Sequence, residues 1–189
     1  SLIKDAAHQT VEDQYEAAKA TCLHIADMIE AGYEVIIGHG NGPQVGFILR
    51  RSEIAAKAEG MHEVPLDVCG ADTQGAIGYA LQQNLQNELQ RRGKARSVAT
   101  VVTKVLVDKA DPAFKNPTKF IGPVYTKADA DRVAQEKGWA FKADGEHWRR
   151  VVPSPQPKRI FELRPIKWLL ERNTIIIAAG GGGIPTMYE

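Results

Sequence analysis

The run Gly38-His39-Gly40-Asn41-Gly42-Pro43-Gln44-Val45-Gly46 is the stretch that decides how this chain folds. It follows an apolar run, Glu34-Val35-Ile36-Ile37, which is typical of a buried strand, and precedes Phe47-Ile48-Leu49-Arg50-Arg51, which is typical of a helix. Glycines ahead of a proline that can occupy the first helical turn predict a strand–loop–helix junction. Such a junction directs backbone N–H groups at the space before the helix, where a phosphate or another small anion can bind.

This glycine-rich run matches no standard nucleotide-binding motif. A dinucleotide fingerprint starting at Gly40 requires glycine at the position of Val45, and the chain contains no G-x-x-x-x-G-K-[ST] motif. A tight turn whose glycines only permit a positive φ is the alternative. The run by itself leaves both interpretations open.

A second glycine run favours the anion site. Thr174-Ile175-Ile176-Ile177-Ala178-Ala179 is typical of another buried strand, and Gly180, Gly181, Gly182 and Gly183 follow it directly. Consecutive glycines cost backbone entropy, so they indicate a place where a ligand or another backbone comes very close. Ligands of open α/β sheets collect outside the carboxyl ends of the strands. The two runs therefore predict one polyanionic ligand held from two sides.

Composition limits the possible partners. The 189 residues are 43% hydrophobic and carry a net charge of +1, with scattered basic residues. We therefore expect one large domain, or one domain with a small appendage, with no nucleic-acid partner and no membrane partner. The apolar stretches are far shorter than a membrane span. Cys22 and Cys69 lie far apart and in no metal-ligand spacing, which predicts buried thiols in a reduced, cytoplasmic protein and no metal site.

Helix and strand patterns alternate along most of the chain. A capping box at Thr10 opens a helix that ends at Gly32, and the strand at 34–37 and a helix to about residue 58 follow. Asp72 is predicted to cap a long helix ending at 91–93, and 97–107 is predicted to be a strand. This alternation predicts an α/β fold with a mostly parallel sheet covered by helices on both faces.

The alternation stops between residues 108 and 157. Prolines make 108–125 irregular, Thr126 is predicted to cap a short helix ending near Gly138, and Asp144-Gly145 is predicted to turn a hairpin. A helix at 162–171 and the strand at 174–179 restore the pattern. We therefore predict a sheet domain of 1–107 and 158–189 with a protruding subdomain of 108–157. The subdomain is a lid or surface decoration, and we favour the lid because lids exclude water during phosphoryl transfer.

Several segments together carry a family resemblance, in this order along the chain: Gly38–Gly46, Val107–Phe114, Asn116–Gly122, Arg149–Pro157 and Gly180–Pro185. The run Arg-Arg-Val-Val-Pro-Ser-Pro and the run Asp-Pro-Ala-Phe are the most specific of them. On these segments the chain resembles the carbamate kinases of the amino acid kinase family.

The resemblance implies a reaction and its partners. It implies an ATP-dependent phosphotransferase that interconverts ATP and carbamate with ADP and carbamoyl phosphate, used to form ATP in arginine catabolism. It also implies a need for Mg²⁺, a cytoplasmic location and a homodimer. The alternatives are another amino acid kinase acting on a carboxylate, or a catalytically dead module that retains the anion-binding loop.

The resemblance also assigns site residues. Lys119 is implied to reach over the active site as a charge clamp, and the catalytic loop is Gly40, Asn41 and Gly42. Substrate or phosphate binding is expected at Gly40, Asn41, Gly42, Pro43, Gln44, Lys119, Gly180, Gly181, Gly182 and Gly183. Carbamate is already an anionic nucleophile, so backbone N–H groups, a lysine and Mg²⁺ suffice without a general base. Arg149 and Arg150 can bind phosphate, but neighbours on a strand face opposite sides, so one of them is expected to be structural.

The chain departs from the family pattern at its ends. Ser1-Leu2-Ile3-Lys4 resembles the continuation of the family's first strand and Gly-Gly-Asn loop, and Glu189 comes soon after the second glycine run. We therefore expect this chain to lack that strand and the carboxyl-terminal nucleotide-binding portion. We also expect the 189 residues alone to be inactive.

Overall fold

The computed structural model describes residues 7–188, which form two compact units. The first unit comprises the chain up to Asn41 together with Gly70–Lys104 and Ile160–Ile184. The second comprises Gly42–Cys69, Val105–Arg159 and the residues from Pro185 onward.

A parallel three-stranded sheet forms the centre of the first unit. Its order is β1 (Ile36–Ile37), β8 (Ile175–Ile177), β2 (Val98–Thr100), and Ile177 pairs with Ile37 on one side and Thr100 on the other. All three isoleucines of β8 are fully buried. The two predicted apolar strands, near 34–37 and 174–179, are thus confirmed as parallel neighbours.

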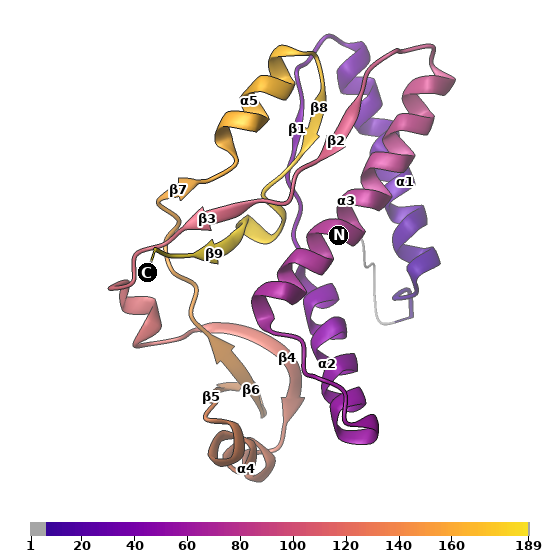
Figure 1. The fold of residues 1–189 in the computed structure, drawn as a ribbon. Helices are drawn as coiled ribbons and strands as arrows, with labels where there is room; N and C mark the ends of the chain where they lie inside the picture. The colour runs from indigo at the N-terminus through magenta and orange to yellow at the C-terminus, as the bar shows by residue number, and fades with distance from the viewer. Residues whose placement is uncertain (1–6, 189) are drawn as a thin grey trace. The chain divides into compact units, whose positions relative to one another are not determined.

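Helices cover both faces of this sheet (Figure 1). Ile175 and Ile177 pack in one cluster with α1 (Val11–Glu30) and α3 (Leu66–Arg91), whereas Ile176 packs on the other face with α5 (Leu163–Glu171). Alternate side chains of a strand point to opposite faces, so one apolar run serves both clusters. The prediction of a helix-covered parallel sheet holds for this unit.

The starts of two helices test the predicted caps. Thr10 caps α1 in a complete capping box, because its hydroxyl accepts from the Asp13 N–H at 3.1 Å and Asp13 accepts from the Thr10 N–H at 3.0 Å. The cap at Asp72 was wrong, since α3 already begins at Leu66. Buried Cys69 packs in an apolar cluster of the second unit, and this packing favours helical structure in the residues before Asp72.

The single strand predicted for 97–107 is two short strands. β2 ends at Thr100, and β3 (Lys104–Leu106) lies in a different sheet, of order β7 (Arg159–Ile160), β3, β9 (Ile184–Thr186). The boundary between the two units crosses these strands. The two strands are separated by residues 101–103. The Thr103 N–H and C=O both bond to the Gln74 side chain of α3, and the same C=O also accepts from the Ile184 N–H of β9.

The second unit contains an antiparallel sheet, so the fold is only partly the parallel one expected. The sheet has the order β4 (Lys119–Tyr125), β6 (His147–Val152), β5 (Ala140–Asp144). Ile121 and Val152 of this sheet pack with Leu49 of α2 (Gly42–Glu59). The segment 108–157 belongs to this unit together with α2. Its role as a protruding lid stays a prediction.

Local predictions in the second unit succeed where turn chemistry is explicit. Thr126 caps α4 (Lys127–Lys137), Gly138 ends it at φ 66°, and Gly145 turns the β5–β6 hairpin at φ 63°. Within 108–125, a short 3₁₀ turn spans Pro112–Phe114, but Lys119–Tyr125 is a strand where we expected irregular structure. A register shift between Ile121 and Val124 accommodates Pro123 within that strand.

The two cysteines are buried and free, as predicted. Burial raises the pKa of the Cys22 thiol to about 11, with a smaller contribution from the negative charge of Glu88. None of the helices in the described part of the chain is long and apolar enough to cross a membrane.

A charged network joins α1 to α3 beside this core. Arg92, the residue after α3, pairs with Asp27 and Glu30 of α1, each at 2.7 Å, and with Glu88 of α3 at 2.5 Å. Hydrogen bonds from Arg91 and Arg92 lower the pKa of Glu88 to about 2, and burial opposes them. The ionised form of Glu88 therefore stabilises the fold.

Glu88 should make the protein sensitive to acid. Its folded-state pKa lies below the ordinary 4.5, so its stabilisation is present above that pH and is lost as the pH falls toward 2. In urea unfolding at a series of pH values, Glu88→Gln should reduce the loss of unfolding free energy across this range. Glu16→Gln, which removes an exposed ion pair with Lys19, should retain the wild-type slope. Equal slopes for Glu88→Gln and wild type would contradict the assignment.

Candidate functional site

The carboxyl ends of the three parallel strands bring together three loops of the first unit. Residues 38–41 follow β1, 178–183 follow β8, and 101–103 follow β2. The Ala178 N–H donates to the Ile37 carbonyl at 2.9 Å, and the Gly181 N–H donates to the His39 carbonyl at 2.7 Å. The structure therefore places Gly180 and Gly181 beside the segment 38–41.

The second glycine run has neighbours too close for side chains. A Cβ on Gly180 would lie 2.5 Å from Cε1 of His39 and 2.9 Å from Cγ of Gln74. A Cβ on Gly181 would lie 2.2 Å from Nδ2 of Asn41. Other parts of the protein thus leave no room for a side chain at either position, and the His39 ring packs directly against Gly180.

Most amides of the second glycine run are used inside the chain. The N–H groups of Gly181, Gly182 and Gly183 donate to the carbonyls of His39, Ala179 and Gly180. Gly181, Gly182 and Gly183 all have positive φ, and the loop forms the short 3₁₀ turn Gly180–Gly182. What the loop presents outward is mainly backbone without side chains, which allows close approach by a ligand.

A buried amide that sequence reasoning missed ties this loop to the segment after β2. Gln74 of α3 is 2% exposed, and its Nε2 donates to the Thr103 carbonyl at 3.1 Å and the Gly180 carbonyl at 2.9 Å. Its Oε1 accepts from the Thr103 N–H at 2.7 Å. The sequence did hold a signal for this residue. Gln74 lies on the same buried face of the helix as Ile77 and Leu81, and a buried amide needs hydrogen-bond partners, so contacts to the neighbouring backbone could have been expected.

Thr103 holds the start of the glycine run. Its hydroxyl accepts from the Ala179 N–H at 2.9 Å and donates to the Val101 carbonyl at 2.8 Å, and the residue is fully buried. Ala179 has φ 52°, a left-handed conformation that costs a non-glycine residue about 1–3 kcal/mol. The surrounding hydrogen bonds stabilise this conformation.

The first glycine run forms the predicted strand–loop–helix junction. β1 ends at Ile37, α2 begins at Gly42, and Pro43 is its second residue. The first N–H groups of a helix have no intrahelical acceptor, so its amino end favours an anion. The boundary between the units falls between Asn41 and Gly42, so Gly42, Pro43 and Gln44 belong to the second unit. Anion binding at this junction stays a prediction.

The basic candidates all lie in the second unit. Lys119 is the exposed first residue of β4, paired in register with Val152. Arg149 donates to the Gly122 carbonyl at 2.9 Å and pairs with Asp144 at 3.4 Å. The Arg150 guanidinium stacks over the Trp139 ring at 3.5 Å, and burial lowers its pKa. Both arginines thus make contacts inside their own unit, and the role of Lys119 stays a prediction.

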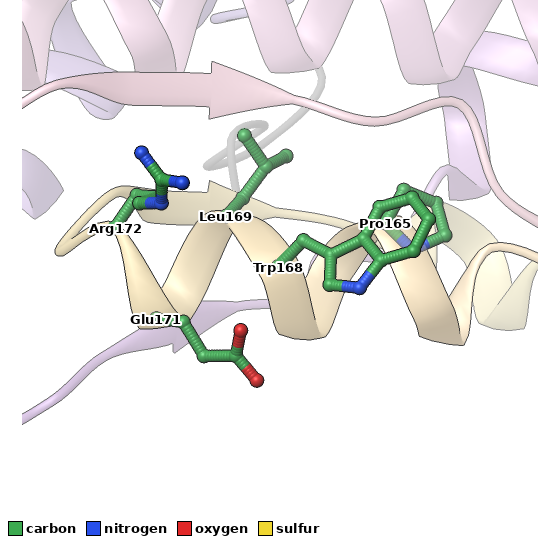
Figure 2. Close-up of a pocket in the computed structure, with 5 residues that line it drawn as sticks. All are labelled: Pro165, Trp168, Leu169, Glu171 and Arg172. Atoms are coloured by element: carbon green, nitrogen blue, oxygen red, sulfur yellow. The ribbon is translucent and has the colours of Figure 1, made fainter.

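An open pocket lies elsewhere in the first unit. It is lined by Pro165, Trp168, Leu169, Glu171 and Arg172, all from α5 and the turn after it (Figure 2). That turn leads to the amino end of β8, whereas the glycine run leaves its carboxyl end. The pocket includes none of the predicted site residues. Within residues 7–188, no group of three or more His, Cys, Asp or Glu side chains is placed to hold a metal ion.

Comparison with known proteins settles the family. The model of the amino acid kinase family matches residues 1–188. The chain belongs to this family. It is 50% identical to a carbamate kinase of Pyrococcus furiosus over 179 residues, 94% of this chain and 57% of the relative. A Haemophilus influenzae carbamate kinase is 50% identical over the whole chain and 59% of its own length.

A solved structure of a carbamate kinase matches the fold of this chain. The carbamate kinase from Giardia lamblia bound to AMP-PNP has a TM-score of 0.89 and 37% identity, covering all of this chain and 60% of its own. A carbamate kinase-like protein of Escherichia coli is 49% identical over 99% of this chain and 60% of its own length. The chain thus spans less than two thirds of the length of these relatives.

Two neighbouring glycines allow the close packing at Asn41 to be tested apart from backbone strain. Gly181 and Gly182 both have positive φ, so alanine at either should cost about 1–3 kcal/mol. Only Gly181→Ala places a Cβ against Asn41, since among the described residues a Cβ on Gly182 meets no atom within 4 Å. The Asn41 side-chain amide resonances should therefore shift in Gly181→Ala and stay unchanged in Gly182→Ala. Unchanged Asn41 resonances in both variants would contradict the packing.

Proposed function

We propose that the protein is a carbamate kinase, which transfers a phosphoryl group reversibly between ATP and carbamate to give ADP and carbamoyl phosphate. The observation that carries the proposal is the close approach of two glycine-rich loops at the carboxyl ends of adjacent parallel strands. Roughly half of the residues are identical to those of proteins named carbamate kinase, which supports the substrate class.

The proposed chemistry needs positioning and charge neutralisation. Carbamate supplies its own anionic oxygen, so the protein has no proton to remove before attack on the γ-phosphoryl group. The loop Gly40, Asn41 and Gly42, the amino end of α2 at Pro43 and Gln44, and the backbone of Gly180–Gly183 would surround the anions. Lys119 would neutralise charge that develops on the transferred group.

Mg²⁺ is expected to enter with the nucleotide. Proteins commonly hold Mg²⁺ through one or two carboxylates and substrate phosphates, with water completing the shell. The metal would supply charge neutralisation on the phosphates.

The cellular location, oligomeric state and pathway of the enzyme also follow from the family resemblance. In keeping with the family resemblance, we place it in the cytoplasm, as a homodimer, in ATP-forming arginine catabolism. The resemblance assigns most of the nucleotide pocket to a portion of the carbamate kinases outside the residues matched here. We therefore expect turnover from a protein that carries the full family length, and little or none from the 189 residues alone.

Coupled ATP formation tests the function. ADP, carbamoyl phosphate and Mg²⁺ should give ATP with the full-length protein, and the 189-residue chain should give little or none. Acetyl phosphate and an N-acylglutamyl phosphate serve as competing donors. Preference for one of these would favour the amino acid kinase alternative, and inertness toward all of them with retained phosphate binding would favour a catalytically dead module.

Lys119 offers a sharper test of the catalytic assignment. In the full-length protein, Lys119→Met should lower kcat by about 10²–10³-fold, the scale for loss of one preorganised charge donor. Lys115→Met removes an exposed lysine four residues earlier and should leave kcat within about twofold of wild type. Similar rates for both variants would remove Lys119 from the proposed mechanism.

A further inference from the structure

The glycine run after β8 is held by hydrogen bonds from outside itself. Four successive glycines have wide conformational freedom, so their own N–H bonds do not determine a single loop shape. Besides the bond from the Gly181 N–H to the His39 carbonyl, two side chains hold the run: the Gln74 amide at the Gly180 carbonyl and the Thr103 hydroxyl at the Ala179 N–H. Both residues are at most 2% exposed, so water does not compete for these bonds.

The Gln74 amide has one orientation that satisfies all of its partners. The NH₂ group faces two carbonyl oxygens, those of Thr103 and Gly180, and the oxygen faces the Thr103 N–H. A flipped amide would place its oxygen against the two carbonyls. Gln74 therefore acts as a bridge that joins the peptide of Thr103 to the peptide of Gly180.

We propose that Gln74 is a positioning residue for phosphoryl transfer. By joining Thr103 to Gly180, it holds the side-chain-free backbone of Gly180–Gly182 against His39 and Asn41. This inference rests on the proposed function, because it assigns the held loop to the reacting phosphoryl group. Gln74 itself touches no reacting atom, so its effect reaches the reaction through the loop.

The same helix supplies a matched control. Gln82, eight residues after Gln74 on α3, accepts from the Thr100 N–H at 2.9 Å. This bond also joins the helix to the sheet edge of β2, but it does not involve the glycine run. Methionine keeps a similar side-chain volume at either position, and it removes three bonds to backbone groups at Gln74 and one at Gln82.

Kinetics of the full-length protein distinguish positioning from simple stabilisation. Gln74→Met should lower kcat about 10–100-fold with little change in KM, since displacement of a site by 1 Å can cost about 10²-fold. Gln82→Met, which removes one bond to the backbone, should lower the Tm by less than Gln74→Met and keep wild-type kcat. The idea fails if Gln74→Met keeps wild-type kcat, or if both variants lose kcat equally.

The variant Gln74→Glu gives a second test of the bridge, through the pH dependence of kcat. The Gln74→Glu carboxylate still accepts from the Thr103 N–H but repels both carbonyls, and its protonated form can donate to one. Its kcat relative to wild type should therefore rise as the pH is lowered. This variant tests the bridge even if Gln74→Met does not fold. Relative kcat that stays flat with pH would count against the bridge.

Amide exchange separates the two proposals. Ala179 and Gly181 should exchange faster in Gln74→Met than in Gln82→Met, and equal exchange would overturn the positioning role. Absence of phosphoryl transfer in the wild-type protein would overturn the proposed function, while faster exchange in Gln74→Met would still establish that Gln74 orders the loop.

Discussion

The parallel pairing of β8 between β1 and β2 is the constraint on which the rest of the first unit depends. It buries three consecutive isoleucines completely, with Ile175 and Ile177 on the α1–α3 face and Ile176 on the α5 face. Because parallel strands end at the same edge, this pairing also delivers three loops to one place. Stability of the sheet and geometry of the candidate site thus share one cause.

The loops are then ordered by buried polar contacts. Gln74 and Thr103 satisfy backbone groups at the break between β2 and β3 and at the start of the glycine run. An unmet buried group would cost about 1–3 kcal/mol, so each contact stabilises the fold as it shapes the loop. Glycine at 180 and 181 follows from the same crowding, because His39, Gln74 and Asn41 occupy the space a side chain would need.

Local chemistry explains which elements could be predicted. The capping box at Thr10, the αL glycine at Gly138 and the Asp144-Gly145 turn are short-range signals, and each element they mark is present. The cap at Asp72 and the continuous strand at 97–107 were wrong because distant partners decide them. Packing of Cys69 accompanies the longer α3, and the Gln74 side chain bonds to the Thr103 N–H and C=O in the gap between β2 and β3.

The sequence by itself determined the α/β alternation, the two glycine runs at strand ends and the family. These follow from periodicity, glycine placement and residue identity, which are readable along the chain. Only the tertiary structure decided that β8 lies between β1 and β2, that the antiparallel sheet adjoins α2 in the second unit, and that Gln74 bridges Thr103 and Gly180. These contacts join residues far apart in sequence, 106 positions for Gln74 and Gly180, and no local propensity specifies them.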